Sequence, residues 1–315
     1  MSSPSITIAI CTWNRADSLR QTLASLRNLQ VPDDLQWEVL IVNNNCTDNT
    51  EEVVASFGEI LPIRSVTEPR QGQSHARNCA IESARGDYIL HTDDDVLVDE
   101  RWLAAYADAF RASPDTAVFG GPILPRFVGE PPHWLKAAMR DIDIGCIYAL
   151  RDLGLEPVPL HPTGNAIPFG ANFAIRMREQ RQFPFDPRLG LQKSGNVRGE
   201  ETDVMRKILA AGGIGRWVPN AAVHHVIPKQ RQTASYMRDY FVGQGRLRVR
   251  RAAPASAPSF LGVPRWLWKA VLTSHLRYAV TRVSCPPGIW CRELRDASIC
   301  WGRYLEHRDA RLRLR

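Results

Sequence analysis

Ser5-Ile6-Thr7-Ile8-Ala9-Ile10 stands near the start of the chain, and the polar segment Thr12-Trp13-Asn14-Arg15 follows after one residue. An unbroken run of β-branched and apolar residues is typical of a parallel strand that is buried on both faces. In open sheets of parallel strands, ligands bind beyond the carboxyl ends of the strands. We therefore predict that residues 5–10 form an inner strand and that the polar segment after it lines a functional site.

The combination of strand, polar turn and helix is repeated along the first hundred residues. Residues 37–42 form a second apolar run, which ends in the turn Asn43-Asn44-Asn45-Cys46-Thr47-Asp48, and further strands are expected at residues 63–67 and 87–91. The helices expected between these strands contain Leu19, Leu23 and Leu26, then Val53, Val54 and Phe57, and then residues 76–84. This alternation indicates right-handed βαβ units. The predicted fold class is α/β, with a Rossmann-like, mostly parallel sheet flanked by helices.

The periodic signals are weaker beyond residue 120. The region 120–200 is rich in Pro and Gly and is expected to hold loops, a helix near residues 132–140 and a short strand around 172–176. A helix over residues 201–211 and a strand over residues 218–223 are predicted after it.

Composition excludes several classes of protein. Of 315 residues, 44% are hydrophobic and 23% charged, as in a globular protein with a sizeable core, so a disordered chain, a collagen or a disulfide scaffold is excluded. The seven cysteines show no CxxC and no paired Cys/His spacing, which gives no support to a zinc site of that kind. Since no apolar leader opens the chain, we expect a cytoplasmic protein.

The net charge of +7 is distributed unevenly along the chain. Residues 1–228 hold 22 Lys and Arg against 28 Asp and Glu, whereas residues 229–315 hold 18 against 5. We predict a catalytic domain over residues 1–245 and a basic helical extension over residues 246–315, with a linker at about residues 252–259.

The extension combines arginine with tryptophan, as in Trp266-Leu267-Trp268-Lys269. This composition is typical of segments that meet anionic lipid headgroups, so peripheral contact with the inner face of the cytoplasmic membrane is one expectation. The other is a helical subdomain that packs its tryptophans on the catalytic core. The apolar stretches carry too many charges to span a membrane.

Asp93-Asp94-Asp95 follows the expected strand at residues 87–91. Adjacent carboxylates repel one another unless a cation offsets their charge. A hard divalent ion, Mg²⁺ or Mn²⁺, that also binds phosphate oxygens is one partner of such a cluster. The alternative is a helix N-cap followed by solvated acidic residues.

Six short motifs occur in a fixed order along the chain. They are Thr12-Trp13-Asn14-Arg15, the turn at residues 43–48, Ala76-Arg77-Asn78, Asp93-Asp94-Asp95, Gly170-Ala171-Asn172 and Gly199-Glu200-Glu201-Thr202-Asp203. In this order and spacing they resemble the family 2 glycosyltransferases of the GT-A fold, over about residues 5–245. The resemblance implies a nucleotide-sugar donor, a divalent metal at a DXD motif, and inversion at the anomeric carbon. It also implies transfer to a hydroxyl of a glycan or lipid-linked acceptor in polysaccharide biosynthesis.

The resemblance assigns several residues to the donor. Thr12 and Trp13 match the place where the family holds the nucleobase, with Trp13 as a stacking face; core packing is the alternative for Trp13. Asn43 stands where the family usually has an aspartate that accepts a hydrogen bond from uracil, and an amide brings a donor as well. UDP is still expected ahead of GDP and dTDP. Donor binding is also expected to involve Asn14, Arg15, Asn45, Arg77, Asp93, Asp94, Gly170 and Asn172.

The resemblance also implies a metal site and a catalytic base. The metal ligands are expected to be Asp95 and Asp93, with His225 or His224 joining them. Inverting transfer needs a carboxylate that takes the proton of the acceptor hydroxyl. Glu201 occupies the family's usual Asp position at a helix N-terminus, with Asp203 and Glu200 as alternatives. Lys229, Arg231 and Arg246 are candidates to close over the pyrophosphate.

Two other classes of protein share some of these features. A sugar-phosphate nucleotidyltransferase would carry a Gly-rich phosphate loop after its first strand, and Cys11-Thr12-Trp13-Asn14-Arg15 has no glycine. A nucleic-acid-binding protein would use the basic extension, but residues 1–228 are net acidic and match no known nucleic-acid module. The sequence therefore favours the glycosyltransferase.

Overall fold

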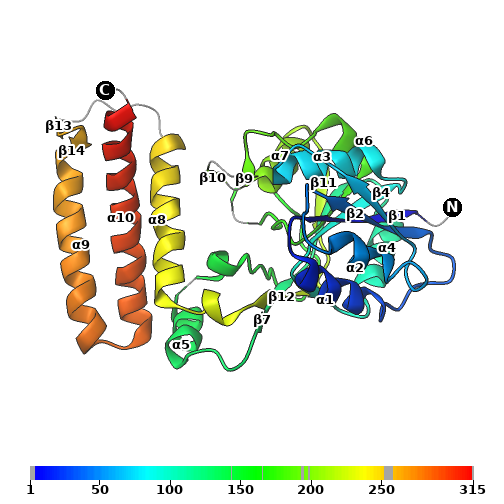
Figure 1. Ribbon diagram of the computed structural model, residues 1–315, viewed down its shortest axis with the longest axis horizontal. Helices are drawn as coiled ribbons and strands as arrows, with labels where there is room; N and C mark the ends of the chain where they lie inside the picture. Colours follow the sequence, from blue (N-terminus) through cyan, green and yellow to red (C-terminus); the bar gives the residue numbers. More distant parts are fainter. Residues whose placement is uncertain are drawn as a thin grey trace. The chain divides into compact units, whose positions relative to one another are not determined.

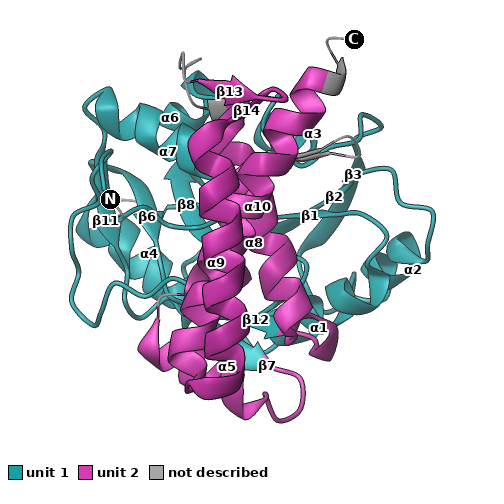
Figure 2. Cartoon of the chain, turned by 90° about the vertical axis from the view of Figure 1, so that its left-hand side faces the viewer, with its two compact units in different colours: residues 1–126, 149–226 teal, residues 127–148, 227–315 magenta. Residues whose placement is uncertain are grey.

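The computed structural model describes residues 4–142, 144–164, 166–192, 195–197, 199–251 and 258–313. The chain divides into two compact units, residues 1–126 with 149–226 and residues 127–148 with 227–315 (Figure 2). The domain boundary expected at residue 245 falls inside helix α8 (Ala234–Arg251). Of the linker expected at about residues 252–259, residues 252–257 lie outside the described part of the chain.

A seven-stranded sheet forms the centre of unit 1 (Figure 1). Its strands, in spatial order, are β11 (Ile214–Trp217), β6 (Thr116–Gly120), β8 (Asn172–Arg176), β4 (Tyr88–Asp93), β1 (Ile6–Thr12), β2 (Trp37–Asn43) and β3 (Ile63–Thr67). β8 runs antiparallel to β4 and β6, and the remaining neighbours pair in parallel. The predicted α/β class with a mostly parallel sheet is confirmed.

Helices cover both faces of this sheet. One face packs on α1 (Ala16–Leu26), α2 (Thr50–Ala55) and α4 (Trp102–Ala112), and the other on α3 (Gln73–Ser83), α6 (Met177–Gln182) and α7 (Glu200–Ala210). Alternate residues of β1 point to opposite faces, so Ile8 and Ile10 join the first core and Ala9 joins the second. Burial on both sides explains why these strands are apolar without alternation.

A smaller sheet completes unit 1. It pairs β5 (Val96–Val98), β12 (Val223–Ile227) and β7 (Ile123–Phe127), and a short hairpin is formed by β9 (Gly190–Gln192) and β10 (Gly195–Val197). The strand predicted over residues 218–223 is wrong, because Pro219 and Asn220 lie in the turn between β11 and β12. The chain therefore forms two strands of different sheets around that turn.

Unit 2 is helical. It contains α5 (His133–Asp141), the 3₁₀ helices η1 (Gly145–Tyr148) and η2 (Lys229–Arg231), α8, α9 (Arg265–Ser284), α10 (Pro287–Arg313), and the two short strands β13 (Ser259–Phe260) and β14 (Val263–Pro264). α10 lies between α8 and α9 (Figure 1). At the α8–α10 crossing, a Cβ at Gly302 would stand 2.0 Å from the carbonyl oxygen of Val242, so the close approach requires glycine.

Among the helices that the structure describes, none has an apolar stretch long enough to cross a lipid bilayer.

Candidate active site

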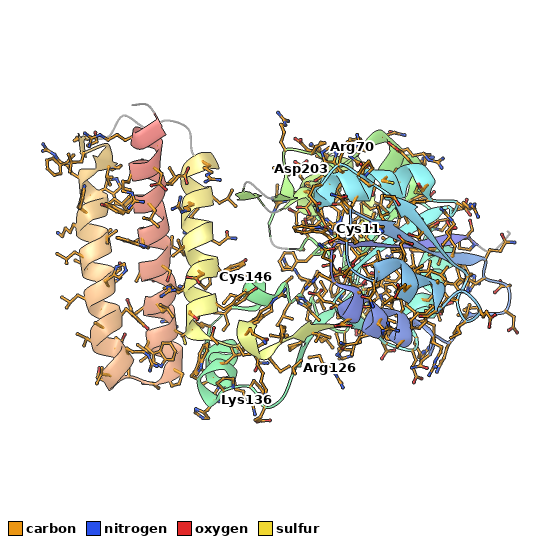
Figure 3. All side chains as sticks on the ribbon, viewed as in Figure 1. Cys11, Arg70, Arg126, Lys136, Cys146 and Asp203 are labelled. Atoms are coloured by element: carbon orange, nitrogen blue, oxygen red, sulfur yellow. The ribbon has the colours of Figure 1, made fainter. Side chains whose placement is uncertain are left out.

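The ends of three neighbouring strands bring the sequence motifs together at one edge of the main sheet. Thr12 at the end of β1 pairs with Asn43 at the end of β2, and Cys11 pairs with Asp93 at the end of β4. Because these strands are parallel, their carboxyl ends meet at the same edge. Figure 3 labels Cys11 in β1 and Asp203 on α7, two of the elements that carry the site.

Arg15 is the counter-ion of Asp94 and Asp95, the last two residues of the acidic triplet. Its guanidinium lies 2.5 Å from Oδ1 of Asp94 and 2.9 Å from Oδ2 of Asp95. The hydroxyl of Thr12 donates to Oδ2 of Asp94 at 2.8 Å. Burial raises the pKa of Asp94 to about 7, against the opposing effect of Arg15. Asp94 is thus a buried tie between the turn after β1 and the turn after β4.

Asp95 and His225 form the pair that best fits a divalent metal. Nε2 of His225 lies 3.4 Å from Oδ1 of Asp95, because β12 pairs with β5 directly after the acidic triplet. His224, its neighbour on β12, is more exposed and on the opposite face. No cluster of three His, Cys, Asp or Glu with metal-site geometry occurs in the described residues. A carboxylate and an imidazole still suit Mn²⁺ when substrate phosphates supply the other ligands, so these residues fit the metal.

Arg77 is the counter-ion of a second acidic cluster. Its buried guanidinium lies 2.9 Å from Oε1 of Glu200 and 3.7 Å from both Oε2 of Glu201 and Oδ1 of Asp93. The expected contact of Arg77 with the nucleotide stays a prediction, and these ion pairs give the side chain a second role within the fold. The side chain extends from α3 toward Asp93, Glu200 and Glu201, and its positive charge offsets the charges of these three carboxylates.

The three candidate bases have different surroundings at the start of α7. Glu200 is buried in its ion pair with Arg77, and Asp203 pairs with Lys207 one turn along the helix at 2.6 Å. Glu201 is partly exposed, and burial together with the charge of Glu200 raises the pKa of Glu201 to about 7, against the opposing effect of Arg77. A carboxylate with a pKa near neutrality is well suited to accept a proton.

Gly170 lies against Arg77 and Glu201. A Cβ at Gly170 would come within 2.8 Å of Nη2 of Arg77 and 3.4 Å of Oε1 of Glu201. A side chain at this position would therefore collide with Arg77, and the place expected for Gly170 beside the donor stays a prediction.

The residues expected to hold the nucleobase lie in the turns after β1 and β2. Trp13 is 45% exposed, which excludes the alternative of core packing, and Asn45 is exposed in a left-handed conformation with φ 66°. Asn14 holds the two turns together, because its Oδ1 accepts a hydrogen bond from the backbone N–H of Thr47 at 2.7 Å.

Asn43 uses both ends of its amide within the fold. Its Oδ1 accepts from the backbone N–H of Cys46 at 2.8 Å, and its Nδ2 donates to Oε1 of Glu51 at 2.5 Å. Glu51 is an exposed residue in the first turn of α2 and belongs to none of the six motifs. Eight residues separate the pair and no motif joins them, so only the fold reveals that a carboxylate lies beside the amide that replaces the family's aspartate.

Asn172 is a structural residue, in contrast to its expected place beside the donor. Its side chain is fully buried, and Oδ1 accepts hydrogen bonds from Nε1 of Trp102 and the hydroxyl of Tyr106, both at 2.9 Å. Its Nδ2 donates to the carbonyl oxygens of Pro122 and Ala221. All of its hydrogen-bonding capacity is therefore spent in the core.

Replacing Asn172 with Ala is expected to lower the free energy of unfolding by about 3–5 kcal/mol, because four buried partners lose a hydrogen bond. Urea denaturation measures this loss. Asn28→Ala, at an exposed asparagine after α1, is the control and should change the free energy by less than about 0.5 kcal/mol. An Asn172→Ala protein of normal stability that has lost donor binding would return this residue to the donor site.

The basic residues expected to close over the pyrophosphate belong to unit 2. Nη1 of Arg246 lies 3.2 Å from Oε2 of Glu306 and 2.9 Å from Oδ2 of Asp309, so this residue joins α8 to α10. Lys229 and Arg231 lie in η2, whose backbone accepts a hydrogen bond from the hydroxyl of Tyr148 at Arg231.

Comparison with known proteins agrees with this architecture. Residues 7–176 match the sequence model of the family described as glycosyl transferase family 2. The succinoglycan biosynthesis protein ExoM of Rhizobium meliloti (strain 1021) is 27% identical over 254 residues, which are 78% of this chain and 76% of ExoM.

Two solved structures share the fold at low sequence identity. The mannosyltransferase PcManGT from Pyrobaculum calidifontis, in complex with GDP-Man and Mn²⁺, superposes with a TM-score of 0.56 at 18% identity and covers 99% of this chain and 74% of its own. Residues 1–349 of S. aureus TarS superpose with a TM-score of 0.54 at 15% identity, covering 89% and 72%. The chain therefore belongs to glycosyl transferase family 2 and is a glycosyltransferase with the GT-A fold.

Proposed function

We propose that this protein is a metal-dependent, inverting glycosyltransferase that moves a sugar from a nucleoside diphosphate, with UDP favoured, to a hydroxyl of a glycan or lipid-linked acceptor. One observation carries the proposal: Glu201, with its pKa raised to about 7, lies in one charge cluster with Asp93 through Arg77. A proton acceptor and a carboxylate of the acidic triplet thus share one edge of the sheet. The likeness to ExoM supports a role in the biosynthesis of a cell-envelope polysaccharide.

In the proposed mechanism Glu201 removes the proton of the acceptor hydroxyl as its oxygen attacks the anomeric carbon. Arg77 has a positioning role, since it holds Glu200 and Glu201 at a fixed separation while its charge keeps part of the cluster ionised. Asp95 and His225 would hold the divalent ion, with Asp93 nearby at the end of β4. When bound, the ion would supply positive charge to the departing diphosphate.

The donor nucleotide is assigned to the turns after β1 and β2. The exposed ring of Trp13 supplies a stacking face for the base, beside Thr12, Asn14 and Asn45. We assign catalysis to unit 1, because every candidate metal ligand and base lies between residues 93 and 225 of that unit.

Calorimetric titration with UDP, GDP and dTDP, each with and without Mn²⁺, tests the proposal. We expect UDP to bind in the presence of Mn²⁺ and the other nucleotides to bind at least about tenfold more weakly. Tighter binding of GDP would keep the enzyme class and change the donor. Absence of binding by all three nucleotides with Mn²⁺ present would contradict the proposal.

The pH dependence of transfer follows from the raised pKa of Glu201. The base must be ionised, so kcat at saturating donor and acceptor should fall about tenfold per pH unit below about pH 7 and level off above it. A pH–rate profile from 5.5 to 8.5 measures this. A kcat that stays level across that range would remove Glu201 from the role.

We also infer that the protein works on the cytoplasmic side of a membrane that carries its acceptor. Residues 229–315, with 18 basic and 5 acidic residues, support peripheral attraction to anionic lipid.

A further inference from the structure

Helix α9 has one packed side and one uncovered side among the described residues of unit 2. Within unit 2 it lies against α10, and Leu267 and Ser274 are its buried side chains. Side chains also extend from α9 on the side away from α10 (Figure 3). The helix is apolar on that side too, and a helix that is apolar on both sides is normally covered on both.

The uncovered side has a continuous apolar stripe, which we call the outer stripe. It consists of Leu272, Leu276, Val280 and Val283, which are 72%, 63%, 57% and 90% exposed. Their spacing of four, four and three residues places them on one face of the helix. Contiguous exposed apolar surface of this kind marks an interaction site.

The charges of α9 are all of one sign. The helix carries Arg265, Lys269, Arg277 and Arg282 and has no acidic residue. Arg277 is paired with Glu293 at 3.1 Å, and Arg282 lies over the ring of Trp290 at 4.3 Å. No ion pair joins Arg265 or Lys269 to another residue in the part of the chain that the structure describes. Two basic side chains at the N-terminal end of the outer stripe are therefore available to an anionic partner.

Aromatic side chains and a shallow hollow adjoin the outer stripe. Trp266 and Trp268, in the first turn of α9, are 48% and 37% exposed. Arg303 of α10 lies over the ring of Trp266 at 4.7 Å, and Trp268 contacts Tyr304 edge-on, so part of each ring faces α10 and part stays open beside the outer stripe. A hollow of about 380 Å³ is lined by Val271, Leu272, His275 and Trp301. Tryptophan favours the boundary between lipid headgroups and acyl chains, and an apolar hollow beside it offers space for part of an acyl chain.

We propose that the outer stripe of α9 docks the protein on the surface of an anionic lipid bilayer. The stripe enters the boundary of the acyl region, the two tryptophans lie at headgroup level, and Arg265 and Lys269 contact lipid phosphates. A second copy of the chain is a poorer occupant, because a symmetric contact through α9 would bring its basic residues against those of the partner. This inference deepens the proposed membrane location and does not depend on the transfer chemistry.

Co-sedimentation of the full chain with phosphatidylcholine vesicles, with and without 30% phosphatidylglycerol, tests the proposal. We expect binding at 0.1 M salt to vesicles that contain phosphatidylglycerol, and at least about tenfold weaker binding to phosphatidylcholine alone. The double variant Leu272→Glu/Val283→Glu should bind anionic vesicles at least about tenfold more weakly than wild type. Both positions are exposed, so the fold should be unaffected, which circular dichroism checks.

The matched control is Leu155→Glu/Ile60→Glu, which makes the same change in net charge at exposed positions of unit 1. It should retain wild-type vesicle binding within about twofold. Equal losses in the two double variants would assign binding to net charge alone and overturn the outer stripe as the docking surface. Absence of wild-type binding to anionic vesicles, or a dimer that dissociates in Leu272→Glu/Val283→Glu, would also overturn it. Nucleotide binding by these variants reports separately on the proposed transferase site.

Discussion

Replacing Glu201 with Gln is expected to lower kcat for sugar transfer by about 10²–10⁴-fold while nucleotide binding stays within about twofold of wild type. The amide keeps the size of the side chain but cannot take a proton from the acceptor hydroxyl. The substitution also removes one of the charges that crowd Arg77, which keeps its 2.9 Å ion pair with Glu200, so the site should remain folded. Steady-state kinetics with calorimetry of the donor nucleotide separates the two effects.

Asp203→Asn is the matched control for this variant. It removes one negative charge from the same first turn of α7, but Asp203 faces Lys207 at 2.6 Å and does not join the Arg77 cluster. Its kcat should remain within about threefold of wild type. If Asp203→Asn loses activity and Glu201→Gln retains it, the base is Asp203. If both variants retain activity, Glu200 is the remaining carboxylate of the motif.

The positions of the strands could be predicted from the sequence because burial on both faces of the sheet requires unbroken apolar runs. Buried strands such as β1, β2 and β4 are apolar runs that end in polar turns, and the turn residues meet at one edge for topological reasons. The strand predicted at residues 218–223 is wrong, because an apolar run also occurs in the connection between two strands. The apolar run that contains Pro219 predicts one strand, whereas it connects β11, which ends at Trp217, to β12, which begins at Val223.

The direction of long side chains could not be predicted from the motifs. Arg77 lies in the expected helix. The direction of its guanidinium depends on the ion pair with Glu200, which is more than a hundred residues away in the sequence. The role of Asn172 could not be predicted either, because its partners Trp102 and Tyr106 lie on α4, which carries none of the six motifs. Polar motif residues therefore include both candidate site residues and buried ties, and the hydrogen-bond partners that the fold gives each of them separate the two.

The outer stripe of α9 was hidden in the sequence for a different reason. Periodicity reveals a helix with one apolar face, and α9 carries apolar residues on the face against α10 as well as on the face away from it. Only when the structure shows that α10 covers one apolar face of α9 can the exposed outer stripe be recognised on the other face.

Replacing Asp95 with Ala is expected to weaken Mn²⁺-dependent nucleotide binding by at least about 100-fold. Loss of a residue that merely supports a metal ligand costs about 10–100-fold in metal affinity, and Asp95 is proposed to be a ligand itself. The variant also frees Arg15 from one of its two carboxylates, which leaves the pair with Asp94 at 2.5 Å and preserves the turn after β1. Calorimetry with and without Mn²⁺ should therefore show that the metal-dependent part of binding is lost.

Two further variants make this result specific. Asp108→Ala removes one exposed carboxylate from α4 in the same unit and should leave Mn²⁺-dependent binding within about twofold of wild type. His225→Ala removes the other proposed ligand, an imidazole that lies 3.4 Å from Asp95, and should likewise weaken Mn²⁺-dependent binding by at least about 100-fold. Asp95→Ala protein that binds the nucleotide as tightly as wild type, with the same response to Mn²⁺, would show that Asp95 serves Arg15 and is not a metal ligand. The metal would then have no ligand in the turn after β4, and the proposed metal dependence would be wrong.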